Sequence, residues 1–150
     1  MVVQYAAPRA GLPGRASIQR WANAAADGRT SITVRFVGTA EGRALNRAYR
    51  GQDHATNVLT FPYPEAGRDI KGATRGGKAG DIVLCAPVIA REARAQGKPL
   101  RAHFAHLLVH GLLHLRGHDH VRRDKARAME ALEIEILRRL GFADPYRSKE

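Results

Sequence analysis

Residues 106–120 read HLLVHGLLHLRGHDH and hold five of the seven histidines in the chain. The segment that leads into them, from Pro99 to Leu115, is apolar on nearly every side of a helix. A helix of that kind is buried at the centre of a domain. The stretch therefore predicts a central buried helix, and Gly117, which can adopt a positive φ, is expected to end it.

Three of these histidines follow the pattern H-x-x-x-H-x-x-G-x-x-H, which is typical of a metal site. At 100° and 1.5 Å per residue, His110 and His114 lie about 40° and about 6 Å apart on a helix, so both imidazoles can face one point. His120 follows the turn at Gly117 and can return to that point. Three imidazoles with a fourth position for water suit one zinc ion, which lowers the pKa of water to about 7 and polarises a phosphoryl or carbonyl oxygen.

Other residues of the motif have more than one interpretation. His106 lies on the same side of the helix but one turn further back, too far to bind the same ion, so we interpret it as a packing residue or a support for a ligand. His118 can take the place of His120 as a ligand. Asp119 can orient an imidazole or accept a proton, and capping the helix end is an equally good role for it.

The position after His110 is Gly111, where metzincin peptidases carry the glutamate that acts as general base. Loss of a general base typically lowers a rate by about 100- to 10,000-fold. Cleavage of a phosphodiester depends less on that carboxylate, because the metal activates water and a cation can bind the phosphate. The motif favours phosphodiester chemistry, with a metallopeptidase as the less favoured alternative.

The composition is that of a folded and strongly basic domain. The 150 residues carry 25 Lys and Arg against 14 Asp and Glu, a net charge of +11, and 44% of them are hydrophobic. The net charge is +5 over residues 1–60, +3 over 61–100 and +3 over 101–150, so no tail carries it. This favours a polyanionic partner such as nucleic acid, although a basic surface without a specific partner gives the same numbers. With 6% aromatic residues, a broad platform for stacking RNA bases is not expected.

The sequence argues against membrane-spanning and disulfide-bonded proteins. The longest apolar run, residues 82–90, has nine residues and contains Pro87, whereas a bilayer needs about 20. Cys85 is the only cysteine, which excludes an internal disulfide and a zinc site with paired thiolates. The N-terminal residues do not have the pattern of a secretory signal. We expect a cytoplasmic protein.

Hydrophobic periodicity predicts an α+β fold, one domain over residues 1–150 with a small mixed sheet of about four strands and helices packed on it. The expected strands are residues 2–5, 31–37, 58–61 and 81–85. The first expected helix has Ile18, Trp21, Ala22 and Ala25 on a single face. The second is capped by Thr39, has Leu45, Ala48 and Tyr49 inward, and is ended by Gly51. The others are a helix from Pro87 to Gly97, the central helix with the metal ligands, and a helix from Arg122 to Leu140. The glycine-rich, basic residues 67–80 are expected to form a surface loop.

Four segments together resemble the YbeY endoribonucleases, also called ribosomal RNA maturation factors. They are AYRGQDHATNVLTFPY (48–63), AGDIVL (79–84), AHLLVHGLLHLRGHDH (105–120) and MEALEIEILRRLGFADPY (129–146). The resemblance implies a metal-dependent endonuclease for single-stranded RNA that acts in small-subunit ribosomal RNA maturation and ribosome quality control in the bacterial cytoplasm. It also implies zinc bound by His110, His114 and His120, an active-site arginine at Arg50, and the same α+β fold.

Several residues of the first two segments have a structural alternative. Arg50 stands at a predicted helix end, where the dipole favours a cation, and its functional role would be to clamp a phosphate. Thr56 and Asn57 can bind substrate or set the turn before a strand. Asp81 can hold a ligand histidine or cap the strand entry.

The leading hypothesis is a zinc-dependent endoribonuclease in which water or a 2′-hydroxyl attacks a phosphate held by Arg50, with His114 needed for cleavage. Its expected partners are single-stranded RNA, ribosomal RNA and the small ribosomal subunit, with a ribosomal protein or an assembly GTPase as further candidates. The alternative is a non-catalytic RNA-binding assembly factor with a structural zinc. The sequence leaves the oligomeric state open.

Overall fold

The computed structural model describes residues 1–26, 31–63, 79–117 and 123–147. In chain order, their elements are β1 (Val2–Ala6), α1 (Arg15–Ala25), β2 (Ser31–Val37), α2 (Thr39–Arg50), β3 (Val58–Pro62), β4 (Ala79–Cys85), α3 (Ala86–Gln96), α4 (Leu100–Leu115) and α5 (Arg123–Arg139). The strands form one sheet in the order β1-β2-β4-β3, in which β3 alone is antiparallel to its neighbour. The predicted α+β fold with a small mixed sheet is confirmed. Within the described residues, no helix has the length and apolar character that crossing a membrane requires.

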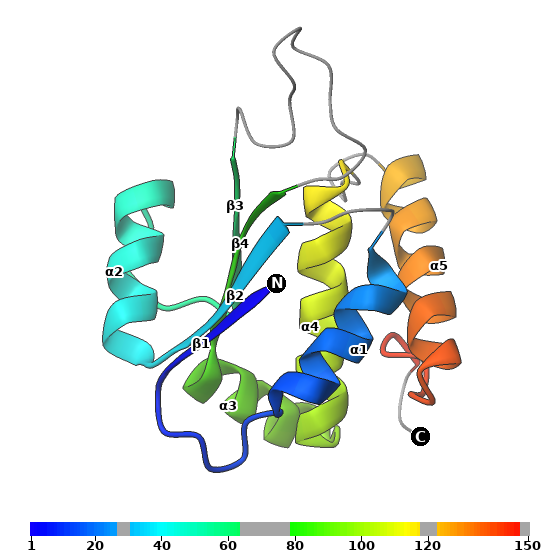
Figure 1. The fold of residues 1–150 in the computed structure, drawn as a ribbon, viewed down its shortest axis with the longest axis horizontal. Helices are drawn as coiled ribbons and strands as arrows, with labels where there is room; N and C mark the ends of the chain where they lie inside the picture. The colour runs from blue at the N-terminus through cyan, green and yellow to red at the C-terminus, as the bar shows by residue number, and fades with distance from the viewer. Residues whose placement is uncertain (27–30, 64–78, 118–122, 148–150) are drawn as a thin grey trace, which may run out of the picture.

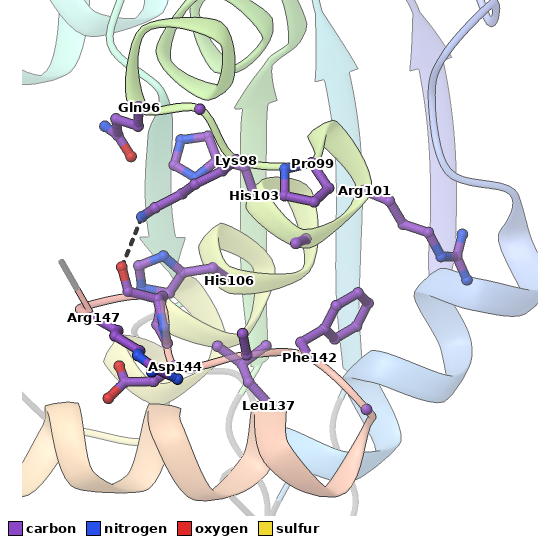
Figure 2. Close-up of a pocket in the computed structure, with 15 residues that line it drawn as sticks. Gln96, Lys98, Pro99, Arg101, His103, His106, Leu137, Phe142, Asp144 and Arg147 are labelled. Carbon is purple, nitrogen blue, oxygen red and sulfur yellow. Dashed lines mark hydrogen bonds between the residues drawn. The ribbon is translucent and has the colours of Figure 1, made fainter. Parts of the chain in front are cut away.

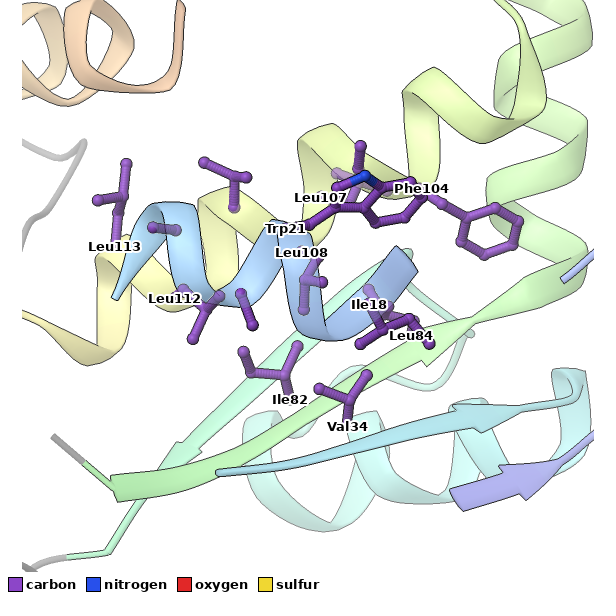
Figure 3. Packing of buried hydrophobic residues seen from close by; sticks show 14 of the residues in the cluster. Ile18, Trp21, Val34, Ile82, Leu84, Phe104, Leu107, Leu108, Leu112 and Leu113 are labelled. Carbon is purple, nitrogen blue, oxygen red and sulfur yellow. The ribbon is translucent and has the colours of Figure 1, made fainter. Parts of the chain in front are cut away.

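The helices lie on both faces of the sheet (Figure 1). Helices α1, α4 and α5 stand on one side, with α4 between the sheet and α5, and α2 covers the other side. Figure 3 shows the larger core, where α1 and α4 pack on the sheet through Ile18, Trp21, Val34, Ile82, Leu84, Phe104, Leu108 and Leu112. A smaller cluster lies on the opposite face and contains Val37, Leu59, Val83, Cys85 and Val88.

Helix α4 is the centre of the fold, as its sequence predicts. Eleven of its 16 residues are buried. It ends at Leu115, and Gly117 follows with a φ of 96°, the left-handed conformation expected there. The guanidinium of Arg116 donates a hydrogen bond to the carbonyl of Ala25 at 2.9 Å, which ties this end of α4 to the end of α1.

The predicted position of α2 along the chain is right, but its predicted inward face is wrong at two of three residues. Leu45 is half-buried and packs against the smaller cluster, whereas Ala48 and Tyr49 are exposed. The predicted cap is also displaced, because Gly38 occupies the N-cap position and Thr39 is the first helical residue.

The buried face of α2 consists of small and polar residues. Gly42 lies so close to the sheet that a Cβ at this position would be 3.0 Å from the Cys85 sulfur. Asn46 is 1% exposed and donates a hydrogen bond from its amide to the carbonyl of His54 at 2.8 Å. The helix therefore approaches the sheet closely at Gly42, and Leu45 is the large apolar side chain of α2 that packs against the smaller cluster.

Strand β4 begins two residues earlier than predicted. Ala79 and Gly80 belong to it, while residues 67–78 of the glycine-rich segment lie outside the described residues. A Cβ on Gly80 would be 2.6 Å from the carbonyl oxygen of Phe61 and 2.8 Å from a methyl of Leu115. The absence of a side chain at Gly80 therefore allows β3 and the end of α4 to approach β4.

Gly80→Ala is expected to lower the free energy of unfolding by about 1–3 kcal/mol, because the added methyl must displace the β3 backbone. Urea denaturation followed by the fluorescence of Trp21 measures this. Gly14→Ser is the control, since nothing lies within 4 Å of a Cβ there and serine is a favourable N-cap for α1. Wild-type stability of Gly80→Ala would contradict the tight approach described here.

Candidate metal centre

His106, His110 and His114 lie along one side of α4, each ring next to that of the following histidine. The ring centroids of His106 and His110 are 6.2 Å apart, and those of His110 and His114 are 4.7 Å apart. The Nε2 atoms of His110 and His114 approach to 3.1 Å. Two nitrogens that bind one tetrahedral zinc ion at 2.0–2.1 Å are about 3.3 Å apart. The structure thus brings two of the three predicted ligands into a geometry that fits zinc.

A buried carboxylate supports these histidines. Glu133 of α5 is fully buried, and its two oxygens accept hydrogen bonds from His106 Nε2 at 2.8 Å and His110 Nδ1 at 2.6 Å. The hydroxyl of Tyr146 also donates to it. Burial alone would raise the pKa of Glu133, but these three hydrogen bonds outweigh burial and lower it to about 2. Glu133 is therefore a carboxylate at neutral pH.

The carboxylate determines which nitrogen of His110 carries the proton. Because an ionised carboxylate only accepts hydrogen bonds, Nδ1 of His110 must be the protonated nitrogen. The lone pair of Nε2 then faces His114. This is the usual arrangement for a histidine that binds a metal, with the second nitrogen held by a carboxylate. The observed hydrogen bonds thus prepare His110 for a metal.

His106, His110 and Glu133 also place donor atoms within 4.8 Å of one another, and such a buried group can hold a metal ion. The separations of 2.6 and 2.8 Å are those of hydrogen bonds, shorter than the edge of about 3.3 Å in a tetrahedral zinc site. We therefore interpret Glu133 and His106 as supports for the ligands. This agrees with the supporting role predicted for His106.

A cavity of about 1030 Å³ lies on the far side of His106, between the α3–α4 turn and the C-terminal segment (Figure 2). The amine of Lys98, which lines the cavity, donates a hydrogen bond to the carbonyl of Pro145 at 2.7 Å and so joins the α3–α4 turn to the C-terminal segment. Neither His110 nor His114 lines this cavity. It is therefore distinct from the metal centre.

Comparison with known proteins identifies the family. The sequence model for "Endoribonuclease YbeY" matches residues 15–141. The chain belongs to the YbeY endoribonuclease family. It is 58% identical to the Endoribonuclease YbeY of Aromatoleum aromaticum, over 92% of this chain and 84% of that protein. It is 53% identical to that of Stenotrophomonas maltophilia strain R551-3, over 97% and 92%.

A solved structure supports the fold. The solution structure of TM1509 from Thermotoga maritima is 21% identical and superposes with a TM-score of 0.56, covering 98% of this chain and 99% of that one. At this identity the similarity concerns the fold alone. The same arrangement of helices and strands is thus found in a solved structure.

Two of the residues that the YbeY motifs suggested have structural roles. Asn57 accepts a hydrogen bond from the Val58 amide at 2.7 Å and donates to Glu92, so it shapes the entry to β3. Asp81 holds neither His110 nor His114, because it accepts a hydrogen bond from Tyr63 on the α2 side of the sheet. Its neighbour Ile82 faces α4 instead.

Of the remaining predicted site residues, the structure describes Arg50. Arg50 is exposed at the last position of α2, across the sheet from α4, and no hydrogen bond or ion pair of its side chain is recorded among the described residues. His118, Asp119 and His120 lie outside the described residues. The third predicted ligand therefore stays a prediction.

Glu133 and Tyr146 are not among the site residues predicted from the sequence. Glu133 lies four residues after Met129 and three before Ile136, both of which are buried. A glutamate at that spacing lies on the buried face of the helix. This position is the signal that could have revealed it, whereas no local pattern connects Tyr146 to α4.

Glu133→Ala is expected to lower the free energy of unfolding by at least about 2 kcal/mol, because the buried His106 and two further hydrogen-bond donors lose their charged acceptor. Urea denaturation of the metal-free protein measures this. Glu135→Ala is a matched control on the same helix, where the exposed carboxylate pairs with Arg138 and Arg139, so its effect should stay within about 0.5 kcal/mol. Similar losses in both variants would contradict a special role for Glu133.

Proposed function

We propose that this member of the YbeY family is a zinc-dependent endoribonuclease that cuts single-stranded RNA in the maturation of small-subunit ribosomal RNA and in ribosome quality control. The relatives named Endoribonuclease YbeY and the match over residues 15–141 support cleavage of RNA. The observation that carries the zinc dependence is the pair of Nε2 atoms 3.1 Å apart on His110 and His114. One domain of 150 residues then holds both the metal centre and the basic surface.

The ligands proposed for the zinc ion are His110, His114 and His120. When bound, the ion supplies Lewis acidity at a phosphoryl oxygen and activates water at neutral pH. Glu133 holds the proton of His110 on Nδ1 and orients its ring through the hydrogen bond at 2.6 Å. Burial of Glu133 keeps water away from this hydrogen bond and fixes the geometry.

Arg50 is proposed to hold the phosphate that is attacked. Its guanidinium is exposed, and two parallel N–H groups can bind two phosphate oxygens at once. Since α2 lies across the sheet from α4, the substrate would have to pass the β3 edge to reach both Arg50 and the histidines. The proposed partners are single-stranded RNA, ribosomal RNA and the small ribosomal subunit, and the proposed compartment is the cytoplasm.

The position of Gly111 argues against peptide hydrolysis. A Cβ there would lie 3.2 Å from a methyl of Ile82 and 3.3 Å from the methyl of Thr60. A side chain at this position would have to displace these methyl groups from a close-packed contact between α4 and the sheet. The packing therefore disfavours a peptidase base at the usual place after the first histidine.

Glu133→Gln is expected to weaken zinc binding by about 10- to 100-fold, because the amide is a weaker acceptor for the proton of His110. Titration of metal-free protein against a competing chelator measures the affinity. Glu135→Gln, an exposed change on the same helix, should bind zinc as the wild type does. Equal affinities in all three proteins would contradict the supporting role of Glu133.

His114→Ala is expected to abolish cleavage of single-stranded RNA because a zinc ligand is lost. The protein should stay folded, since the His114 side chain is only half-buried. Zinc content, circular dichroism and cleavage of a labelled RNA are measured on the same preparation. Wild-type cleavage by the metal-free variant would refute the zinc mechanism. Normal binding of ribosomal subunits without any cleavage by the wild type would instead favour the non-catalytic assembly factor.

A further inference from the structure

Three aromatic side chains gather at the β3 edge of the sheet. Tyr49, in the last turn of α2, is 68% exposed, and its ring centroid is 4.6 Å from that of Phe61 on β3. Tyr63 follows two residues after Phe61, on the same side of the chain, and is 41% exposed. We call these three residues the aromatic edge.

The aromatic edge lies on the face of the sheet opposite α4. Phe61 is paired in register with Asp81, whose carboxylate accepts a hydrogen bond from the Tyr63 hydroxyl. Thr60 points the other way, since its methyl is next to Gly111 of α4. Strand β3 thus contacts the helix of the metal centre on one face and carries the aromatic edge on the other.

Folding alone does not account for this exposure. Tyr49 lies three residues after the buried Asn46, a spacing that allows its ring to face the sheet, and the sequence predicts an inward position for it. Tyr49 instead contacts Phe61 and leaves most of its surface in water. The hydroxyl of Tyr63 is anchored by Asp81, so both exposed rings are held in place without being buried.

The charge around the aromatic edge is positive. Arg47 and Arg50 share one side of the last turn of α2, which adjoins the side that carries Tyr49, and both are exposed. No ion pair involving either is recorded among the described residues. Asp81 is the carboxylate recorded in contact with the edge, and it is engaged by Tyr63. Exposed rings beside unpaired arginines match the chemistry of a single-stranded nucleic acid, whose bases stack and whose phosphates bind cations.

We propose that Tyr49, Phe61 and Tyr63 form a narrow stacking site for one or two bases of single-stranded RNA, with Arg47 on the adjoining phosphate. This site rests on the proposed function and extends it: the strand that reaches the metal centre crosses the β3 edge and is held there by its bases. The scarcity of aromatic residues argues against a broad platform, but three of the nine lie at this edge, where one strand can use them.

Binding of hydrolysis-resistant RNA tests the site on the zinc-loaded protein. Two fluorescein-labelled ligands are compared by anisotropy, a single-stranded 2′-O-methyl oligonucleotide and the same backbone with abasic residues throughout. Tyr49→Ala and Tyr63→Leu are each expected to weaken binding of the first ligand by about 10-fold and to leave the second unchanged. Tyr49→Phe keeps the ring and should retain wild-type affinity.

Arg47→Ala tests the phosphate contact separately. It should weaken both ligands and reduce the slope of log affinity against log salt by about 0.7, the value for one phosphate of a single strand. Arg20→Ala, an exposed arginine of α1 on the other side of the sheet, is the control and should leave the affinity for both ligands unchanged.

The outcomes separate the stacking site from the proposed function. The stacking site would be overturned if Tyr49→Ala lost the same affinity for both ligands, or lost affinity for neither. It would also be overturned if a polyglutamate peptide of equal charge displaced the RNA from the edge. In cleavage assays, Tyr49→Ala should raise KM about 10-fold with kcat retained, and an unchanged KM would also overturn it. If the wild type neither binds nor cuts single-stranded RNA, the proposed function itself fails.

Discussion

The carboxylate of Glu133 is the buried charge on which the arrangement of the histidines depends. An ionised carboxylate in an apolar core costs several kcal/mol unless its oxygens are hydrogen-bonded. Here His106 and His110 of α4 and Tyr146 of the C-terminal segment supply the donors. Helix α5 can therefore pack on α4 only in the register that brings these groups to Glu133. The same hydrogen bonds that stabilise the charge also set the proton and the ring orientation of His110.

Much of the fold is predictable because local signals and packing agree. The strand from Ser31 to Val37 alternates strictly and is found over those residues. Gly51 and Gly97 end their helices with positive φ, as their positions predict. The apolar character of α4 predicts its burial, because no orientation would leave a polar face in water. For these elements, the hydrophobic pattern and the glycine positions within each segment are enough to predict how the segment packs.

The remainder depends on contacts between segments far apart in the sequence. The inward face of α2 is wrong in the prediction because periodicity assigns Tyr49 to the core, whereas Gly42 and Asn46 make the contact. A hydrogen bond from Asn46 to His54 becomes apparent only when the loop after the helix is in place. The convergence of His110 and His114 follows from helix geometry, but their carboxylate partner arrives from α5, 23 residues beyond His110. Spacing within one helix cannot identify such a partner.

Gly111 connects the packing of α4 with its chemistry. The helix that carries His110 and His114 approaches the sheet so closely at this residue that a Cβ would contact Ile82 and Thr60. The absence of the peptidase glutamate is thus a consequence of helix–sheet packing as well as a difference in catalytic residues. Restoring a glutamate would force α4 away from the sheet and would disturb the positions of both histidines. Peptidase chemistry would therefore require a different packing of this helix, whereas phosphodiester cleavage needs only the metal, a cation for the phosphate, and the histidine geometry that the close packing maintains.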